Sequence, residues 1–183
     1  MKQRDELDRY YTPPTLADKL VGLLTFDGMP RVLEPHAGDG AFLRALPSNV
    51  RRYCNDIDPG APALEWGRQM GATVTTGDFL EMPAPLDYQY DWIIGNPPFN
   101  NFEKHIDRAL MLSPRVAFLL RLAVMESSKR AACWKRWPLQ HVWVLAERPS
   151  FTGGGTDSAA YGFFYFNRYC QGAATITPGW SWK

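Results

Sequence analysis

The chain has 183 residues, of which 45% are hydrophobic and 21% are charged, with a formal net charge of +1, which suits a single domain over residues 1–183. No apolar run is long enough to span a bilayer and the charged start lacks a secretory signal, so we expect a cytoplasmic protein away from membranes. The three cysteines, Cys54, Cys133 and Cys170, are too scattered for a disulfide framework or a zinc site, and no metal is expected.

Short β-rich runs alternate with helical patterns along the chain. We expect strands at residues 31–34, 51–55, 72–76, 90–96, 115–122, 141–147 and 162–169. Helices are expected between them, at residues 15–24, 41–46, 61–70, 102–112 and 127–137. Several strands are almost continuously apolar, as in a sheet buried on both faces. The alternation predicts a Rossmann-like α/β fold, with a mostly parallel seven-stranded sheet, helices on both faces and an antiparallel edge strand.

A glycine turn follows the first expected strand. The sequence LEPHAGDGAFL leads through Gly38 and Gly40 into a helix, so the backbone can approach a ligand closely and present unpaired N–H groups to it. Glu34 and Asp39 would repel a pyrophosphate, but they suit a ligand with a positive sulfonium and an amino group. The turn therefore favours S-adenosylmethionine over a dinucleotide.

Acidic residues also follow the second and third strands. Asp56 lies roughly 20 residues beyond the glycine turn, where a carboxylate takes both ribose hydroxyls, and Ile57 is placed to pack on adenine. Asp78 is placed to accept from the adenine amino group, with Phe79 near the ring face. Each acidic residue alone is more often a turn or N-cap residue. Acidic residues at consecutive strand ends nevertheless indicate a cofactor site at the carboxyl edge of the sheet.

The fourth strand ends in Asn96-Pro97-Pro98-Phe99. The two prolines fix the backbone and remove donors, which leaves the carbonyls of Asn96 and Pro97 rigid and available. If the Asn96 side-chain oxygen and the Pro97 carbonyl accept both N–H bonds of a ring amine, its lone pair is directed at the methyl donor for in-line displacement. Phe99 offers a stacking surface for a planar base or amide. The alternative is a rigid turn that merely ends a strand.

These motifs resemble those of the amino-methyltransferases that make N6-methyladenine in DNA, including enzymes of restriction–modification systems and bacteriophages. The resemblance covers nearly the whole chain and includes an N-terminal motif, YTPP, which holds the methionine end of the cofactor in that family. It implies a class I methyltransferase fold, S-adenosylmethionine as cofactor and DNA as substrate. The cofactor-binding positions that it implies are Tyr11, Thr12, Pro13, Glu34, His36, Gly38, Gly40, Asp56, Ile57, Asp78, Phe79 and Asn96. The catalytic positions are Asn96, Pro97, Pro98 and Phe99.

Two features depart from the family. His36 stands where a small residue is often found, and no separate target-recognition domain is expected. The protein would then have low sequence specificity, act as an oligomer, or recognise a short site with loops. Whether it is a monomer or a homodimer is left open.

Substrate contacts are expected in the second half of the chain. Residues 1–103 hold 9 Lys and Arg against 15 Asp and Glu, whereas residues 104–183 hold 11 against 4, which suits a polyanionic partner but also fits chance segregation of surface charge. Basic side chains alternate with tryptophans in SSKRAACWKRW, which indicates phosphate contacts and base stacking, or equally a solvated amphipathic helix. The substrate-binding positions so predicted are Phe99, Phe151, Lys129, Arg130, Lys135 and Arg136. Phe151 resembles the family's aromatic that closes over a flipped base, and the loop at 152–160 either closes over the substrate or simply connects two strands.

Three alternatives to DNA adenine methylation remain. RNA adenine methyltransferases also use NPPF on a compact domain. Protein glutamine N5-methyltransferases typically have Tyr in the fourth position and a helical N-terminal domain. The third alternative is an inactive methyltransferase-fold binding subunit, against which the intact motif argues. No catalytic or metal-binding set is expected of His36, His105 and His141.

Overall fold

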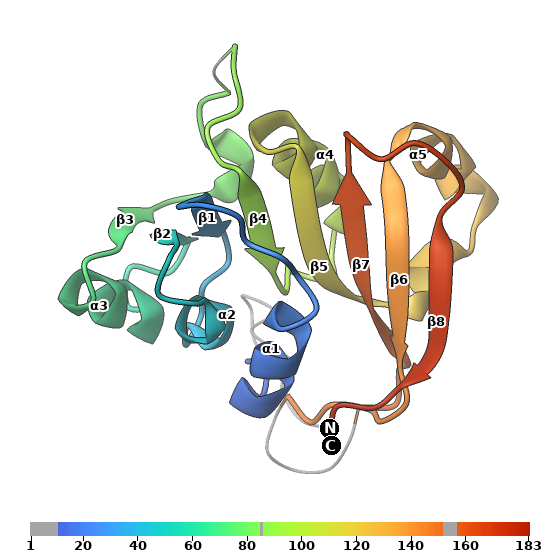
Figure 1. The fold of residues 1–183 in the computed structure, drawn as a ribbon, viewed down its shortest axis with the longest axis horizontal. Coiled ribbons are helices and arrows are strands. Elements are labelled where there is room, and N and C mark those ends of the chain that lie inside the picture. Colours follow the sequence, from blue (N-terminus) through green and yellow to red (C-terminus); the bar gives the residue numbers. More distant parts are fainter. Residues whose placement is uncertain (1–10, 85, 152–156) are drawn as a thin grey trace.

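A computed structural model describes residues 11–84, 86–151 and 157–183. In these residues eight strands form one sheet in the order β3-β2-β1-β4-β5-β7-β6-β8 (Figure 1). The strands are β1 (Arg31–Glu34), β2 (Arg51–Asp56), β3 (Thr73–Thr76), β4 (Trp92–Gly95), β5 (Arg115–Arg121), β6 (Leu139–Leu145), β7 (Tyr161–Asn167) and β8 (Thr175–Trp180). The helices are α1 (Pro14–Val21), α2 (Ala41–Ala45), α3 (Pro62–Gln69), α4 (Phe102–Leu112) and α5 (Ala131–Arg136), with the 3-10 turns η1 (Phe79–Glu81), η2 (Leu122–Met125) and η3 (Ser128–Arg130).

The predicted mostly parallel α/β sheet is confirmed. Strands β1 to β5 pair in parallel, and β7 is antiparallel to both of its neighbours, β5 and β6. The sheet has one strand more than expected, because β8 pairs in parallel with β6 at the outer edge. The sequence of β8 contains Pro178 and Gly179 and its residues are mostly exposed, so it lacks the apolar run that marks the other strands. An edge position tolerates a proline because one side of the strand makes no ladder bonds.

Helices cover both faces of the sheet (Figure 1). Helices α1, α2 and α3 pack on one face, where Leu16, Leu20 and Phe42 join one apolar cluster. Helix α4 packs on the other face, where Ile106 belongs to a second cluster with Trp137, and Trp134 of α5 packs against it. The two faces alternate along β5, since consecutive residues of a strand point in opposite directions. No helix in the described parts of the chain is long and apolar enough to cross a membrane.

The helix expected at residues 127–137 is divided in the structure. Ser127 has a positive φ of 109°, after which the 3-10 turn η3 precedes the short helix α5. Trp134 and Trp137 pack against the second apolar cluster, as expected for an amphipathic segment whose tryptophans face the core. Residues 152–156, which include the three consecutive glycines of the expected loop, lie outside the described residues.

Candidate active site

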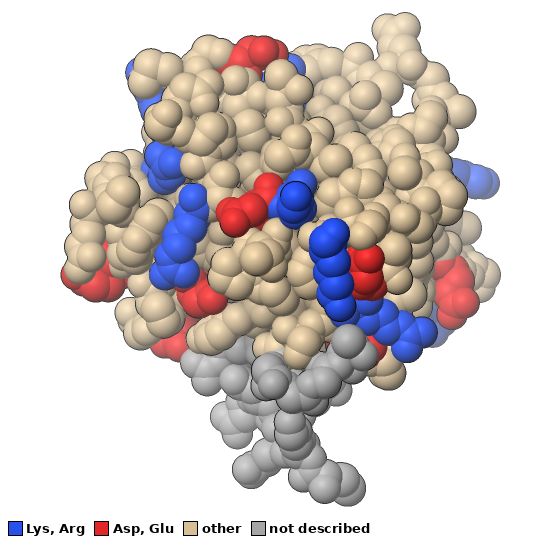
Figure 2. Space-filling view, turned by 60° about the horizontal axis from the view of Figure 1, so that its bottom comes forward, with Lys and Arg blue, Asp and Glu red and all other residues tan. Residues whose placement is uncertain are grey.

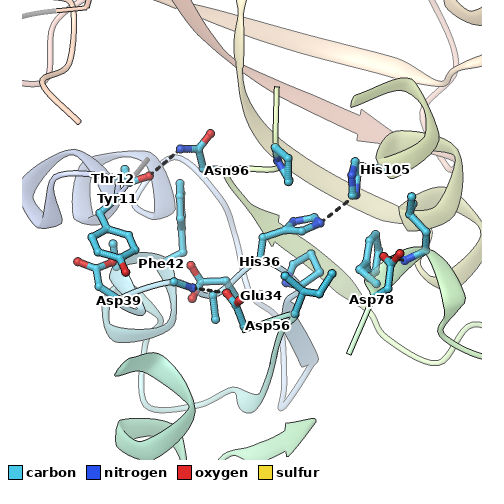
Figure 3. A pocket seen from close by; sticks show the side chains of 18 of the residues that line it. Tyr11, Thr12, Glu34, His36, Asp39, Phe42, Asp56, Asp78, Asn96 and His105 are labelled. Carbon is cyan, nitrogen blue, oxygen red and sulfur yellow. Dashed lines mark hydrogen bonds between the residues drawn. The ribbon is translucent and has the colours of Figure 1, made fainter. Parts of the chain in front are cut away.

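A pocket of about 320 Å³ lies at the carboxyl edge of the sheet (Figure 3). Its walls come from the segments that follow β1 to β4, together with the residues that precede α1 and the first turn of α4. The predicted site residues that line it are Tyr11, Thr12, Glu34, His36, Gly38, Asp56, Ile57, Asp78, Phe79, Asn96 and Pro98. Residues far apart in sequence thus meet at one edge, as expected for an open α/β sheet.

Four of the residues predicted to bind the cofactor or to be catalytic do not line this pocket. Pro13 is the N-cap of α1, and Gly40 is the N-cap of α2 with a φ of +82°. Pro97 lies between Asn96 and Pro98 in the NPPF tetrapeptide, and Phe99 lines a separate cavity of about 200 Å³. Asp39, whose charge was expected to suit a cationic ligand, also lines the pocket. Further lining residues that the motifs do not indicate are Pro35, Ala37, Ala41, Phe42, Gly77, Leu80, Asn100, Asn101 and His105.

The turn after β1 requires glycine at Gly38. Its φ is +52°, and a Cβ added there would lie 3.0 Å from a ring carbon of Tyr11. A side chain is therefore excluded both by backbone strain and by the close approach of the tyrosine ring. Gly38 in turn donates its backbone N–H to Asp56 at 2.7 Å, which joins the turns after β1 and β2.

The carboxylates of Asp56 and Asp78 have local partners as well as a place in the pocket wall. Asp56 accepts the N–H groups of Gly38 and Asp58, the latter at 2.9 Å. Asp78 accepts the N–H of Leu80 at 2.9 Å as the N-cap of η1. A carboxylate has about four acceptor sites, so these bonds fix both groups in place and leave capacity for a ligand. Asp56 and Asp78 can therefore stabilise their own turns and still bind a ligand.

Glu34 faces the pocket but is engaged by helix α2. The side chain is 3% exposed, and its carboxylate accepts the N–H of Leu43 at 2.7 Å. Burial raises the pKa of this carboxyl well above its ordinary value, although hydrogen bonds from the α2 backbone oppose the shift. Glu34 therefore holds the start of α2 against β1 and orients the glycine turn.

Asn96 stands at the end of β4 with its amide held by a partner from the N-terminal segment. Its Nδ2 donates to the Thr12 hydroxyl oxygen at 3.3 Å. Thr12 is 4% exposed and immediately precedes α1, so its position is fixed by the helix. With the nitrogen directed at Thr12, the amide oxygen lies on the other side of the group, as Figure 3 shows.

Two histidines meet in the pocket wall, a contact that the sequence analysis did not foresee. His36 Nε2 and His105 Nδ1 are 2.9 Å apart, and both rings pack near Phe79. Burial lowers the pKa of His36 well below its ordinary value, and the neighbouring His105 lowers it further. Burial also lowers the pKa of His105 to about 4, against the opposing influence of Asp78. Both imidazoles are therefore neutral at pH 7, and one donates to the other.

Phe99 and Phe151 lie together beside a second cavity. Their ring centroids are 6.4 Å apart, with an interplanar angle of 68°. Phe99 also lines a cavity of about 200 Å³ together with Arg121 and Arg130, at the start of α4 and the end of β5. The two aromatic residues predicted to contact substrate are thus neighbours.

Two of the four basic residues predicted to contact substrate are engaged within the protein. Arg130 donates to Glu103 at 2.7 Å, and Arg136 pairs with Asp107 at 2.5 Å. Glu103 and Asp107 are one turn apart on α4, so these pairs fasten the η3–α5 segment to that helix. Arg130 also borders the second cavity. Both arginines therefore fit the alternative of an amphipathic segment better than a role in phosphate contacts. Lys129 and Lys135 are exposed on the same segment.

The surface at the carboxyl edge of the sheet carries both positive and negative side chains. Figure 2 turns this edge forward and shows basic and acidic side chains interspersed over a largely uncharged surface. The basic half of the sequence thus does not form one continuous basic patch on the part of this face that the structure describes. Ion pairs between the two halves, such as Arg130 with Glu103, contribute to this mixing.

No family model matches the chain. A Type II methyltransferase of Thermus thermophilus, M.TthHB8I, is 39% identical over 98 residues, which are 51% of this chain and 21% of that protein. The chain thus spans about a fifth of the length of this relative.

Solved structures resemble the whole arrangement. A Listeria monocytogenes protein classed as a class I S-adenosylmethionine-dependent methyltransferase matches with a TM-score of 0.76 and 14% identity, over 98% of this chain and 68% of that one. The methyltransferase subunit of a type I restriction–modification system from Streptococcus thermophilus matches with a TM-score of 0.74 and 14% identity, over 92% and 47%. A Pyrococcus horikoshii protein classed as an RNA methyltransferase matches with a TM-score of 0.71 and 18% identity, over 91% of both chains. The fold is that of the class I methyltransferases.

Proposed function

We propose that this chain binds S-adenosylmethionine in the pocket of about 320 Å³ and transfers the methyl group to the N6 amino group of adenine in DNA. The observation that supports this most directly is the position of Asn96. It ends β4 at the carboxyl edge, in the pocket wall, with its amide oriented by Thr12. The same pocket wall contains the carboxylates expected for the cofactor.

The pocket suits this cofactor in size and in charge. Its volume falls at the lower end of the range for small-molecule sites, about 300–1,000 Å³. Asp56 and Asp78 provide acceptors for the ribose hydroxyls and the adenine amino group, and their negative charge favours a cationic ligand. Gly38 allows the backbone to approach the ligand, while Tyr11 covers the turn from the N-terminal side. When bound, the cofactor supplies the methyl group of its sulfonium, and the sulfur is left as a neutral thioether.

The NPPF loop provides the acceptors for the substrate amine. The Asn96 amide oxygen and the Pro97 carbonyl each accept one amine N–H, which directs the nitrogen lone pair toward the methyl group. With the cofactor bound, the amine nitrogen would form a bond to the methyl carbon as the sulfur–carbon bond of the cofactor breaks, and the amine proton would pass to solvent. No side chain is required as a nucleophile, so positioning and hydrogen bonding provide the rate.

The likeness to the Type II methyltransferase favours DNA over other targets. Its 39% identity over 98 residues exceeds the 18% identity of the Pyrococcus horikoshii protein that is classed as an RNA methyltransferase. Transfer of labelled methyl from S-adenosylmethionine to DNA, RNA and protein in parallel, followed by nucleoside analysis, distinguishes the targets. We expect label in 6-methyladenine of DNA. Label confined to RNA or to glutamine in protein would contradict the proposal.

Replacing Asn96 tests the division between the cofactor site and the catalytic loop. Asn96→Ala should abolish methyl transfer and leave the calorimetric affinity for S-adenosylmethionine within a few-fold, because one of the two acceptors for the substrate amine is lost. Asp56→Ala provides the reverse comparison and should mainly weaken cofactor binding. If Asn96→Ala lost cofactor binding in parallel with activity, the assignment of Asn96 to the reacting amine would be wrong.

A further inference from the structure

One face of the Phe99 ring is covered by Arg121, the last residue of β5. The guanidinium carbon lies 4.2 Å from the ring centroid, well within the distance at which a cation is attracted to an aromatic face. The two residues meet because β4 and β5 are parallel neighbours and Phe99 follows β4. A base that stacks on Phe99 while this contact persists must use the opposite face of the ring.

Arg121 is itself held by two residues, one at the start of β7 and one in the segment that precedes it. It lies directly opposite Tyr161 in the pairing of β5 with β7 and donates from Nε to the Tyr161 hydroxyl oxygen at 3.2 Å. Its Nη2 lies 3.6 Å from the carboxylate of Asp157. The Tyr161 hydroxyl in turn donates to Asp157 at 2.6 Å. The three side chains thus form a closed polar network.

The charges of this network are stable around neutral pH. Burial raises the pKa of the Tyr161 hydroxyl, which stays protonated as a donor. Burial opposes ionisation of Asp157, but hydrogen bonds from Tyr161 and Ala159 and the charge of Arg121 hold the pKa of its carboxyl below the ordinary value. The guanidinium therefore has a fixed anionic partner on one side and an aromatic ring on the other.

The same network also reaches Phe99 through the ring of Tyr161. The Tyr161 ring centroid lies 5.8 Å from that of Phe99 and 5.1 Å from that of Phe151. Phe99 is thus fixed by a cation on one face and by aromatic rings around it. Arg121, Tyr161 and Asp157 are all absent from the described wall of the cofactor pocket.

We propose that Arg121, Tyr161 and Asp157 form a positioning network that sets the orientation of Phe99 for stacking against the substrate base. The inference rests on the proposed function and deepens it, because it adds residues that act on the nucleic acid through Phe99. The network should therefore control the use of DNA and leave the cofactor site unchanged. Asp157 acts through Arg121 and Tyr161, whereas Tyr161 acts both through Arg121 and through its own ring contact with Phe99.

Two conservative variants test the network. Arg121→Lys keeps the charge but loses the planar guanidinium and its fork of donors, and Tyr161→Phe removes only the hydroxyl. We expect both to lower kcat/KM for DNA at least about tenfold, while the calorimetric Kd for S-adenosylmethionine stays within about twofold. Stacking is followed directly with an oligonucleotide in which 2-aminopurine replaces the adenine that the wild-type protein methylates. Its fluorescence in the complex should differ between the wild type and both variants.

The chain offers matched controls at the other end of the same strands. Arg115 begins β5 and its guanidinium carbon lies 5.6 Å from the ring centroid of Trp92. Tyr165 of β7 stacks on the same tryptophan at 5.3 Å. Arg115→Lys and Tyr165→Phe make the same chemical changes away from Phe99. Both should retain wild-type kcat/KM and 2-aminopurine fluorescence.

The outcomes separate the inference from the proposed function. If the wild type transfers no methyl group to DNA, the proposed function fails and the inference fails with it. If the wild type is active and both variants retain its kcat/KM and fluorescence, the inference alone is overturned. The same holds if the matched controls lose as much activity as the variants, or if cofactor binding falls in parallel with activity, because a general loss of structure then explains the result.

Discussion

The hydroxyl of Thr12 and the amide of Asn96 come together from positions 84 residues apart in the chain. An amide side chain has two similar ends, and only its oxygen can accept an amine N–H. A donor bond from the nitrogen to Thr12 therefore selects the rotation in which the oxygen is available to substrate. In this arrangement Thr12 contributes to orienting the amide, in addition to lining the pocket proposed to hold the cofactor.

Replacing Thr12 by valine removes the acceptor and keeps the shape. We expect Thr12→Val to slow methyl transfer by about tenfold in single-turnover measurements, because the amide loses its preferred rotation. The loss of one buried hydrogen bond should lower the free energy of unfolding by about 1 kcal/mol. Thr12→Ser is the matched control and should retain the rate. Equal rates for the two variants, measured at saturating cofactor, would contradict the orienting role.

Individual side chains illustrate what the sequence pattern leaves open. The motif placed Asp56, Asp78 and Asn96 at strand ends, and the structure has all three in one pocket. The pattern does not reveal that Glu34 is bound to the start of α2, because that bond depends on how the helix packs against β1. Nor does it reveal the engagement of Arg130, whose partner Glu103 lies on a different element.

At the scale of elements, boundaries and exposed strands were the hardest to predict. Helix α4 runs over the residues expected from its apolar periodicity, since a long amphipathic pattern is unambiguous. Strand β8 was missed because its pairing with β6, rather than an apolar run, makes it a strand. The segment expected as one helix at 127–137 is helical over residues 128–136, as the 3-10 turn η3 followed by α5, and the positive φ of Ser127 marks where it begins. Tertiary contacts decide such cases.

The contact between His36 and His105 connects the turn after β1 with α4. A histidine whose pKa is lowered in the folded state is neutral there, while the unfolded state takes up a proton below about pH 6.5. The contribution of His105 to the free energy of unfolding is therefore fully present above the pKa of about 6.5 that it has in the unfolded state. This contribution is lost as the pH falls toward the folded-state pKa of about 4. For His105 alone this amounts to about 2 kcal/mol between pH 8 and pH 5.

Urea unfolding at pH 8 and pH 5 measures this effect. The wild type should lose at least part of its free energy of unfolding at pH 5, and His105→Gln should lose less between the same two values, because glutamine does not titrate. His141→Gln is the comparison variant away from the pocket, where His141 bonds to Thr175 and Thr177. Burial lowers the pKa of His141 as well, but less than that of His105, so His141→Gln should reduce the pH dependence by less than His105→Gln does. If wild type and His105→Gln lost the same free energy of unfolding between pH 8 and pH 5, the histidine pair would not be a source of this pH dependence.

Over the whole molecule, the acidic and basic halves of the sequence are not two opposed surfaces. Arg130 and Arg136 from the basic half pair with acidic residues of α4, and the carboxyl edge carries charges of both signs (Figure 2). Counting charges along the chain could not show this, because ion pairs form between elements that only the fold brings together. Lys129 and Lys135 are exposed beside these pairs, so their charges are available to a polyanion.

Lys129 and Lys135 should therefore contribute to nucleic-acid binding, whereas Arg136 should contribute to fastening α5. Each contact between a lysine and a phosphate releases counterions, so a plot of log Kd against the logarithm of the salt concentration has a slope of about one per contact.

We expect Lys129→Gln and Lys135→Gln to weaken DNA binding and to lower this slope by about one unit each. Arg136→Gln should leave the slope unchanged and lower the melting temperature slightly, since its ion pair is exposed. Fluorescence anisotropy over a salt series measures the slope, and an unchanged slope in both lysine variants would place the DNA on another surface.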